Sequence, residues 1–303
     1  MALSNKINKQ IGGKFERMKA FGDSKHELLE QGRKEGDQYK YTQNKIFSFK
    51  TYQTYMTNTQ IAFEKIQEMH PDKHFKDISQ FEKYVPEYLE KCISEGKSAW
   101  TVQAYASALS KFYGKSNPDW KVELPERKRD EITRTRNTRE DQRFSEKLNP
   151  EVVRWAKNTG LRRSELENIK KSDCRLENGK LYIDVKGSYA KGGKPRTVEC
   201  IAEGKDLDKM IERLENLGDK NRVFGAIKAQ APIHKYRAEY ARNLYEREAR
   251  PREQITNKKE LYTLRGGVRA GETYDRVAMR TVTENLGHGR LNVIADHYLQ
   301  GGY

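Results

Sequence analysis

Residues Asn285–Tyr298 read NLGHGRLNVIADHY. The triplet Leu286-Gly287-His288 is typical of a helix end, because glycine readily adopts the left-handed conformation that closes a helix. Tyr298 follows His288 by ten residues. The stretch therefore places a histidine at the end of one helix and a tyrosine a short, defined distance beyond it.

Two earlier motifs in the same half of the chain combine arginine with other polar residues. Residues Thr159–Leu166 read TGLRRSEL. Arg162 stands at the expected start of a helix, where backbone N–H groups favour an anion, and Glu165 follows one turn later. Further on, the tetrapeptide HKYR spaces His234 and Arg237 three residues apart, which predicts that both lie on one face of a helix.

A lysine-rich turn lies between two predicted strands. Residues Lys180–Val185 (KLYIDV) and Thr197–Ile201 (TVECI) have the composition of strands. The segment between them, Lys186–Lys194, reads KGSYAKGGK. It presents three lysines, at positions 186, 191 and 194, close together in one turn.

The apolar pattern divides the chain into four segments. Residues 1–38 are polar and dotted with glycine, and we expect an N-terminal arm with at most one or two helices. Residues 39–116 carry apolar stripes at helical spacing and predict a small helical bundle. Residues 117–144 are rich in arginine and lack apolar periodicity, which is typical of a basic linker. Residues 145–303 form a second domain, with helices predicted at 150–157, 163–170, 207–217, 233–247 and 275–286.

Composition excludes several classes of protein. The chain has 303 residues and a formal net charge of +15, and only 35% of it is hydrophobic. A membrane protein is excluded because no stretch approaches the roughly 20 apolar residues that a transmembrane helix needs. Cys92, Cys174 and Cys200 are too few and too scattered for a disulfide framework or a zinc cluster, which favours a reducing cytosol. The excess of positive charge makes a polyanion the leading partner.

Taken together, the motifs resemble the tyrosine recombinases, the phage-type integrase family. The family pattern is an arginine in T-G-x-R-x-x-E-L, a lysine in a β-hairpin, H-x-x-R, L-G-H, and a nucleophilic tyrosine nine or ten residues beyond that histidine. Each element occurs here in the same order. The helical bundle and its end, Ser98–Leu109, are also similar to the core-binding domain of the family.

The resemblance implies a role for each motif residue. The two arginines would bind the scissile phosphate, with one histidine as a further donor. The second histidine could take the proton of the tyrosine, which would be the nucleophile, or support proton transfer. The lysine would protonate the departing 5′-oxygen. The corresponding positions are Arg162 and Arg237, His288, His234, Tyr298 and Lys191. Lys191 matches best because AKGGKPR resembles the G-K-G-x-x-R turn of the family, while Lys186 and Lys194 stay open as alternatives.

The fold implied by the resemblance is mainly α with a small antiparallel β-sheet. A helical, SAM-like core-binding domain at residues 39–116 would bind DNA, a mixed α+β catalytic domain would occupy residues 145–303, and both would close around DNA as a C-shaped clamp. Arg237 and His288 lie 51 positions apart, farther than in most members of the family. The additional residues form an insertion at about 246–274, which is either a DNA-contacting loop or a solvated insertion.

The implied activity is that of a site-specific recombinase or integrase. Such an enzyme cleaves and rejoins duplex DNA through a 3′-phosphotyrosyl intermediate and serves a phage or mobile element. The covalent link stores the bond energy, so no metal, ATP or other cofactor is expected, and the sequence contains no P-loop. The expected partners are duplex DNA at its attachment sites and further copies of the chain, as a tetramer in the synaptic complex, without a membrane. The expected location is cytoplasmic and nucleoid-associated.

Two other functions stay open. A DNA-binding regulator that has lost catalysis would keep the basic surfaces and would not need Tyr298. A metal-dependent transposase would need a cluster of carboxylates. Asp184, on the strand Lys180–Val185, is the best starting point for such a cluster, but the sequence offers no convincing second and third carboxylate.

Overall fold

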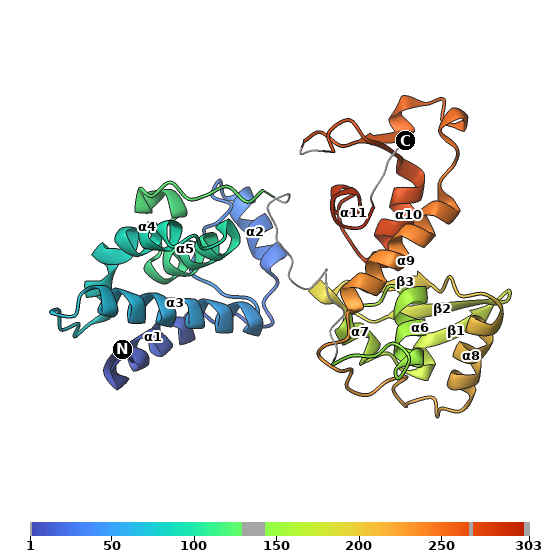
Figure 1. Ribbon diagram of the computed structural model, residues 1–303, viewed down its shortest axis with the longest axis horizontal. Helices are drawn as coiled ribbons and strands as arrows, with labels where there is room; N and C mark the ends of the chain where they lie inside the picture. Colours follow the sequence, from blue (N-terminus) through green and yellow to red (C-terminus); the bar gives the residue numbers. More distant parts are fainter. Residues whose placement is uncertain (1, 129–142, 267–268, 300–303) are drawn as a thin grey trace. The chain divides into compact units, whose positions relative to one another are not determined.

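The computed structural model describes residues 2–128, 143–266 and 269–299. The chain forms two compact units, Met1–Ile132 and Thr133–Tyr303 (Figure 1). Helices dominate both, and the strands form small antiparallel sheets, as predicted. In the described ranges no helix is both long enough and apolar enough to cross a membrane. The clamp around DNA stays a prediction.

Within the described ranges, the first unit is built from helices. Four of its five α-helices begin after a serine whose hydroxyl accepts a hydrogen bond from a backbone N–H of the first turn. The core is aromatic: the rings of Phe63 and Phe81 stack with centroids 4.2 Å apart. The elements of this unit are α1 (Asn5–Glu16), α2 (Lys25–Lys34), α3 (Phe49–Met69), η1 (Ile78–Tyr84), α4 (Val85–Ser94), α5 (Ala99–Tyr113) and η2 (Asn117–Trp120).

Helix α1 differs from the expected N-terminal arm, because it packs into the core of the first unit. Ile7, Ile11 and Phe15 form a stripe along one face and are buried, and the ring of Phe15 lies 5.3 Å from that of Phe112. The stripe holds only one apolar residue per turn among polar neighbours. It therefore has the composition of an extension although it has the packing of a core helix.

The predicted linker also begins inside the first unit. The Trp120 side chain is buried, and its indole N–H donates a hydrogen bond of 2.7 Å to the Ser110 hydroxyl. Val122 and Leu124 pack against the same core. Residues 129–142, which hold several of the arginines that suggested a linker, lie outside the described residues.

The second unit combines helices with a three-stranded antiparallel sheet of order β1-β2-β3. The lysine-rich turn joins β2 to β3, as predicted from the sequence. Strand β1 was not predicted, although the Asn178-Gly179 turn that joins it to β2 has positive φ at both residues, as in the tight turns favoured by Asn-Gly. The elements are α6 (Pro150–Thr159), α7 (Arg163–Leu166), η4 (Lys171–Asp173), β1 (Cys174–Glu177), β2 (Lys180–Val185), η5 (Lys191–Gly193), β3 (Arg196–Glu199), α8 (Gly204–Glu215), α9 (Ile233–Glu248), η6 (Arg252–Gln254), η7 (Lys258–Glu260), β4 (Leu261–Thr263), β5 (Thr273–Asp275), α10 (Arg276–Leu286) and α11 (Asn292–His297).

Helix α7 is shorter than the predicted helix over 163–170. It ends at Leu166 because the chain then turns to form backbone hydrogen bonds with residues far ahead in the sequence. The N–H of Val223 donates to the carbonyl of Ile169 at 2.9 Å, and Lys170 pairs with Arg222. These bonds fix the short helix against the rest of the unit.

Helix α9 lies against α6 and α10 and forms the centre of this unit. Its buried face carries Tyr236, Tyr240 and Leu244, whose side chains are fully buried. Gly160 ends α6 in the left-handed conformation, with φ +58°, directly beneath the ring of Tyr240. A Cβ atom at position 160 would lie 2.3 Å from Cδ1 of Tyr240, so the close approach of α6 and α9 requires glycine there.

Gly160→Ala should lower the free energy of unfolding of the second unit by about 2–5 kcal/mol, from the left-handed backbone and the overlap with Tyr240 together. Gly179→Ala is the matched control, because Gly179 has φ +75° with open space around it. That change should cost only the backbone part, about 1–2 kcal/mol. Urea denaturation of the two variants measures the difference, and equal losses would contradict the tight packing at Gly160.

Candidate active site

Arg237 on α9 is the most deeply placed cation of the site, with 1% of its surface exposed. Its Nη1 donates to the carbonyl of Gly160, and its Nη2 donates to the carbonyl of Leu286 at 2.5 Å. Gly160 is the C-cap of α6 and Leu286 is the last residue of α10. A helix C-terminus carries unpaired carbonyls and partial negative charge. Two helix ends therefore hold one buried guanidinium.

Nε of Arg237, and Nη2 for a second time, face two of the predicted site residues. Its Nε lies 3.3 Å from the phenol oxygen of Tyr298, and its Nη2 lies 3.3 Å from Nε2 of His288. Burial, as the largest cause, lowers the pKa of Arg237 to about 10. The guanidinium therefore keeps its charge at neutral pH.

His288 contacts Tyr298 directly. Its Nε2 lies 3.2 Å from the phenol oxygen of Tyr298. Burial of the ring, and then the charges of Arg237, Arg162 and Lys191, lower the pKa of His288 to about 4. The imidazole is thus neutral at neutral pH. Because a guanidinium can only donate, Nε2 accepts from Arg237, which assigns the ring proton to Nδ1.

Glu165 lies beneath this group as a fully buried carboxylate. Arg196 binds it in a bidentate manner, from Nη1 to Oε1 at 3.0 Å and from Nη2 to Oε2 at 2.8 Å. Arg162 adds hydrogen bonds from its backbone N–H at 2.8 Å and from Nη1 at 2.9 Å. Burial raises the pKa of Glu165, but the hydrogen bonds and charge of Arg196 and the backbone N–H of Arg162 outweigh it and bring the pKa to about 2.

Arg196 was missed by the sequence analysis, although its role in building the site is large. Besides Glu165 it binds the carbonyl of Asn285 through Nε at 2.8 Å, which ties β3 to the end of α10. Gly287, which closes α10 with φ +64°, makes room for it, since a Cβ there would lie 2.9 Å from Cδ of Arg196. The signal in the sequence was its place at the end of AKGGKPR, the stretch that resembles the G-K-G-x-x-R turn of the family.

Lys191 and His234 stand at the exposed edge of the group. Partial burial is the main cause that lowers the pKa of His234, followed by the charges of Arg237, Arg162 and Lys191. The charge of Lys191 thus acts on both His234 and His288. Lys186, by contrast, forms an ion pair with the buried carboxylate of Asp173.

The structure therefore joins three of the six predicted residues, while Arg162, Lys191 and His234 are linked to them through charge. Arg237, His288 and Tyr298 are in direct contact, and the charges of Arg162 and Lys191 reach both histidines. Glu165 is already bound by two arginines. Cations outnumber carboxylates in this group, so the arrangement favours an added anion such as a phosphate.

Asp184, the starting point for a metal-dependent alternative, lies elsewhere in a different setting. Its carboxylate accepts hydrogen bonds from Nε of Arg175 at 3.1 Å and from the hydroxyl of Thr197 at 2.7 Å. Across the described part of the chain, no group of three or more His, Cys, Asp or Glu side chains is arranged to hold a metal ion.

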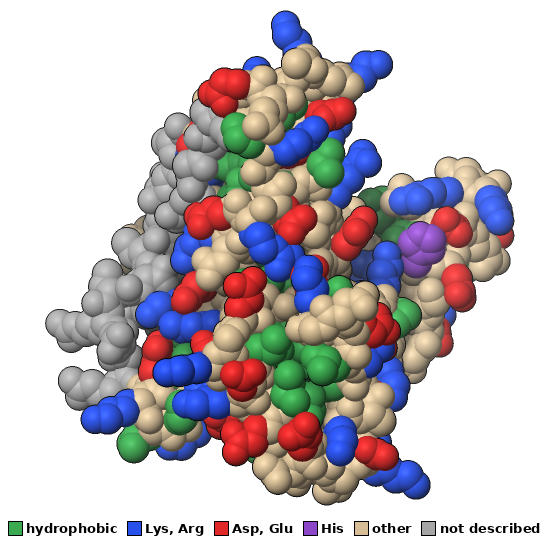
Figure 2. Space-filling view, turned by 90° about the vertical axis from the view of Figure 1, so that its right-hand side faces the viewer, with side chains coloured by type: hydrophobic (Ala, Val, Ile, Leu, Met, Phe, Trp, Pro, Cys, Tyr) green, Lys and Arg blue, Asp and Glu red, His purple; other side chains and the backbone are tan. Residues whose placement is uncertain are grey.

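Charge on the outer surface does not mark the site by itself. On the face drawn in Figure 2, Lys and Arg side chains are interspersed with Asp and Glu side chains. The arginines of the site have other partners. Arg237 binds two backbone carbonyls, and Arg162 and Arg196 share the buried carboxylate of Glu165.

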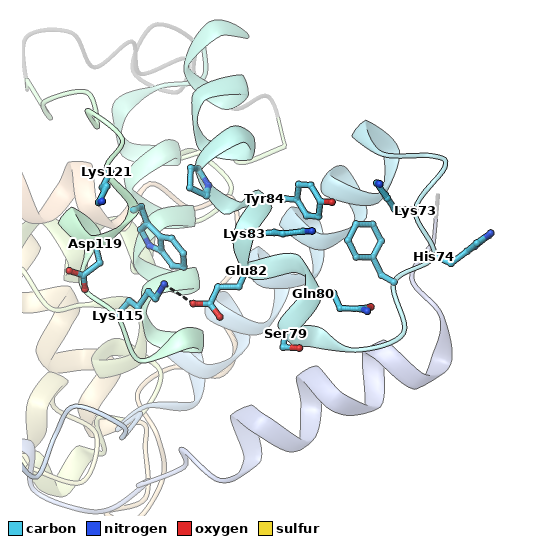
Figure 3. Close-up of a pocket in the computed structure, with 13 residues that line it drawn as sticks. Lys73, His74, Ser79, Gln80, Glu82, Lys83, Tyr84, Lys115, Asp119 and Lys121 are labelled. Atoms are coloured by element: carbon cyan, nitrogen blue, oxygen red, sulfur yellow. Dashed lines mark ion pairs between the residues drawn. The ribbon is translucent and has the colours of Figure 1, made fainter.

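The first unit contains an open hollow of about 640 Å³ (Figure 3). Its wall includes the ion pair between Nζ of Lys115 and Oε1 of Glu82, at 2.6 Å, and the side chains of Lys83 and Tyr84. None of the six predicted site residues lines it. The hollow is therefore separate from the candidate active site.

No protein-family model and no curated protein matches the chain. Among solved structures, the post-cleavage complex of XerH site-specific recombinase with a palindromic difH substrate aligns with 99% of this chain and 88% of its own, at 17% identity and a TM-score of 0.48. XerA recombinase aligns with 91% and 94%, at 17% identity and a TM-score of 0.33. The Tn1549 transposon integrase in complex with circular intermediate DNA aligns with 83% and 95%, at 13% identity and a TM-score of 0.44.

Glu165→Gln should destabilise the second unit by about 3–5 kcal/mol at neutral pH, because it leaves the buried guanidinium of Arg196 without its counter-charge. The folded-state pKa of Glu165 lies below its ordinary value. Its contribution to stability is therefore complete above about pH 4.5 and is lost as pH falls toward 2.

The test is the free energy of unfolding of the wild-type chain and of the variant between pH 7 and pH 3. Glu177→Gln is the control, because Glu177 is exposed on β1 and pairs with Arg175 at the surface. It should change the stability by no more than about 0.5 kcal/mol. A Glu165→Gln variant as stable as this control would contradict the buried pairing.

Proposed function

We propose that the chain is a site-specific DNA recombinase of the tyrosine type. The observation that carries the proposal is the position of the Tyr298 phenol, 3.3 Å from Nε of the buried Arg237 and 3.2 Å from Nε2 of the neutral His288. A phenol placed between a cation and a proton acceptor is positioned to act as a nucleophile. The surplus of cations around it suits a phosphodiester as the group attacked.

The first step is loss of the phenolic proton as Tyr298 attacks phosphorus. A tyrosine has an ordinary pKa near ~10, so a positioned acceptor assists this step at neutral pH. We assign the acceptor to His288, because its Nε2 lies within hydrogen-bonding distance of the phenol oxygen. His234, which the sequence suggests for taking this proton or for supporting proton transfer, stays a second candidate.

The second requirement is stabilisation of negative charge on the nonbridging oxygens of the phosphate. Arg162 and Arg237 supply guanidinium groups whose orientation is already set, by Glu165 and by two helix-end carbonyls respectively. Donors held in place before the reaction need little reorganisation when charge develops. The site thus combines a fixed nucleophile with fixed anion-binding groups.

The third requirement is a proton for the leaving group. The bond between phosphorus and the Tyr298 oxygen forms while the bond between phosphorus and the 5′-oxygen breaks, and the 5′-oxygen leaves as a hydroxyl. Lys191 is our candidate for the donor of this proton, because it lies exposed on η5 and its charge reaches His234 and His288. Rejoining reverses these steps on a new 5′-hydroxyl, and neither metal nor ATP takes part.

The partner in this proposal is duplex DNA at a recombination site. Exchange of strands between two duplexes requires four active sites, so we propose a tetramer of the chain in the synaptic complex. We also propose that the chain recombines the DNA of a phage or another mobile element. The net charge of +15 favours the association with the phosphate backbone.

Tyr298→Phe should abolish a covalent protein–DNA adduct while leaving DNA affinity unchanged, because it removes the nucleophilic oxygen only. The substrate is a duplex selected for binding to the chain from a random pool and then nicked at successive positions, so that cleavage is trapped. The reaction is run in EDTA and resolved on a denaturing gel.

Tyr303→Phe is the control, at a tyrosine that lies outside the described residues, and its adduct should persist. A wild-type chain that binds this DNA but forms no adduct at any nick position would instead support a regulator without catalysis. An adduct or a cleavage product that appears only with Mg²⁺ would support a metal-dependent transposase.

Arg237→Lys should lower the single-turnover rate of cleavage by about 10²–10³-fold, because one ammonium cannot replace three oriented donors. Affinity for DNA should change far less, since the variant keeps the charge. Arg222→Lys is the control, at an exposed arginine, and should match wild type. Equal losses of cleavage and binding in Arg237→Lys would make this arginine a phosphate anchor only.

A further inference from the structure

The segment between α9 and α10 is a folded part of the second unit. It corresponds to the insertion at about 246–274, and it contains the short hairpin β4–β5, in which Tyr262 pairs with Tyr274. Figure 1 draws it in orange, at the end of the unit where α10 and α11 lie. Leu261, Leu264 and Tyr274 are buried. The sequence left open a DNA-contacting loop or a solvated insertion, and these buried residues show that part of the segment packs on its own unit.

Arg269 in this segment binds backbone on both sides of Tyr298. Its Nη1 donates to the carbonyl of Ala295 at 3.0 Å and to the carbonyl of Leu299 at 2.9 Å. Ala295 lies three residues before Tyr298, and Leu299 directly follows it. A single guanidinium from the insertion therefore joins the last turn of α11 to Leu299, two residues beyond the end of that helix.

The backbone of α11 explains why such a donor is needed. The N–H groups of Tyr298 and Leu299 both donate to the carbonyl of Ile294, at 2.9 and 3.1 Å. The N–H of Leu299 is thus turned away from Ala295, its regular helical partner. Ala295 and Leu299 are both buried, and buried carbonyls require a hydrogen-bond donor. Arg269 supplies it at the end of the helix.

Arg269 is itself held in place by its own segment. Its Nη2 lies 2.7 Å from Oε2 of Glu272, and the hydroxyl of Tyr274 donates to the same oxygen at 2.6 Å. The ring of Tyr274 packs edge-on against Tyr245 of α9, whose hydroxyl accepts a hydrogen bond from the N–H of Asp275 at 2.9 Å. These contacts fix the guanidinium relative to the helix that carries Arg237.

We propose that Arg269 is a positioning residue for the nucleophile, and this inference rests on the recombinase function proposed above. By binding the carbonyls of Ala295 and Leu299, it holds Tyr298 where the phenol meets Arg237 and His288. Arg269 touches neither the phenol nor the phosphate in this account. The insertion thereby fixes the end of α11. It affects cleavage only because it sets the position of Tyr298.

The test uses the full-length chain and two measurements. Hydrogen–deuterium exchange without DNA follows the peptide that covers residues 292–299. Single-turnover adduct formation on the selected, nicked duplex follows cleavage at saturating DNA. In Arg269→Ala, exchange in that peptide should rise, and adduct formation should slow by about 10- to 100-fold, because displaced reacting groups lose rate steeply. Affinity for DNA should change by less than about threefold, since Arg269 makes no contact with phosphate in this proposal.

Two further variants separate positioning from charge and from misfolding. Arg265→Ala removes one exposed positive charge from the same segment and should leave both exchange and rate unchanged. Arg269→Lys keeps the charge and folds with less disturbance, but a single ammonium cannot span both carbonyls and Glu272. It should recover part of the rate and part of the protection.

The outcomes are distinguishable. Unchanged exchange in Arg269→Ala would show that Arg269 does not fix the end of α11, whether or not the chain cleaves DNA. Raised exchange with an unchanged rate of adduct formation would overturn the positioning role. Raised exchange in a chain whose wild-type form makes no adduct would overturn the recombinase function and the role of Arg269 in it, while the hydrogen bonds to α11 would stand.

Discussion

The site depends on one buried guanidinium. Arg237 is 1% exposed, and a buried charge is tolerated only where oriented acceptors replace water. Here the acceptors are the carbonyls that end α6 and α10, at Gly160 and Leu286. Nη1 and Nη2 bind those two carbonyls. Nε therefore faces Tyr298, and the second N–H of Nη2 faces His288. The fold of the second unit thus fixes the direction in which the cation acts.

Charge then organises the surroundings of Arg237. Glu165 is the one buried carboxylate that neutralises the neighbouring arginines among the described residues of the site, and two arginines share it. Burial, and after it the remaining positive charge, lowers the pKa of both His234 and His288. His288 is thereby kept neutral, so its unprotonated ring nitrogen can accept a hydrogen bond. The same burial and charges keep His288 neutral and hold the arginines in place for an anion. The packing of the unit therefore sets both features that the proposed chemistry needs.

The motif residues could be predicted because each lies in a short pattern of fixed spacing, and strand β2 and helices α9 and α10 because their apolar periodicity is strong. The rest depends on contacts between distant parts of the chain. Arg196 binds Glu165 across 31 positions, and Arg269 reaches Leu299 across 30. The sparse apolar stripe of helix α1 predicts an arm, whereas its packing is that of a core helix. No local pattern encodes such partners, so only the folded chain reveals them.

If the proposed function is right, the Tyr298 oxygen becomes linked to the 3′-phosphate of cleaved DNA. The most direct measurement is mass spectrometry of the trapped adduct after digestion with nuclease and trypsin. The peptide that begins at Leu291 contains both Tyr298 and Tyr303, and its fragment ions locate the added nucleotide. We expect the nucleotide phosphate on Tyr298. A phosphate on Tyr303 or on any other residue, or cleaved DNA with a free 3′ end and no adduct, would contradict it.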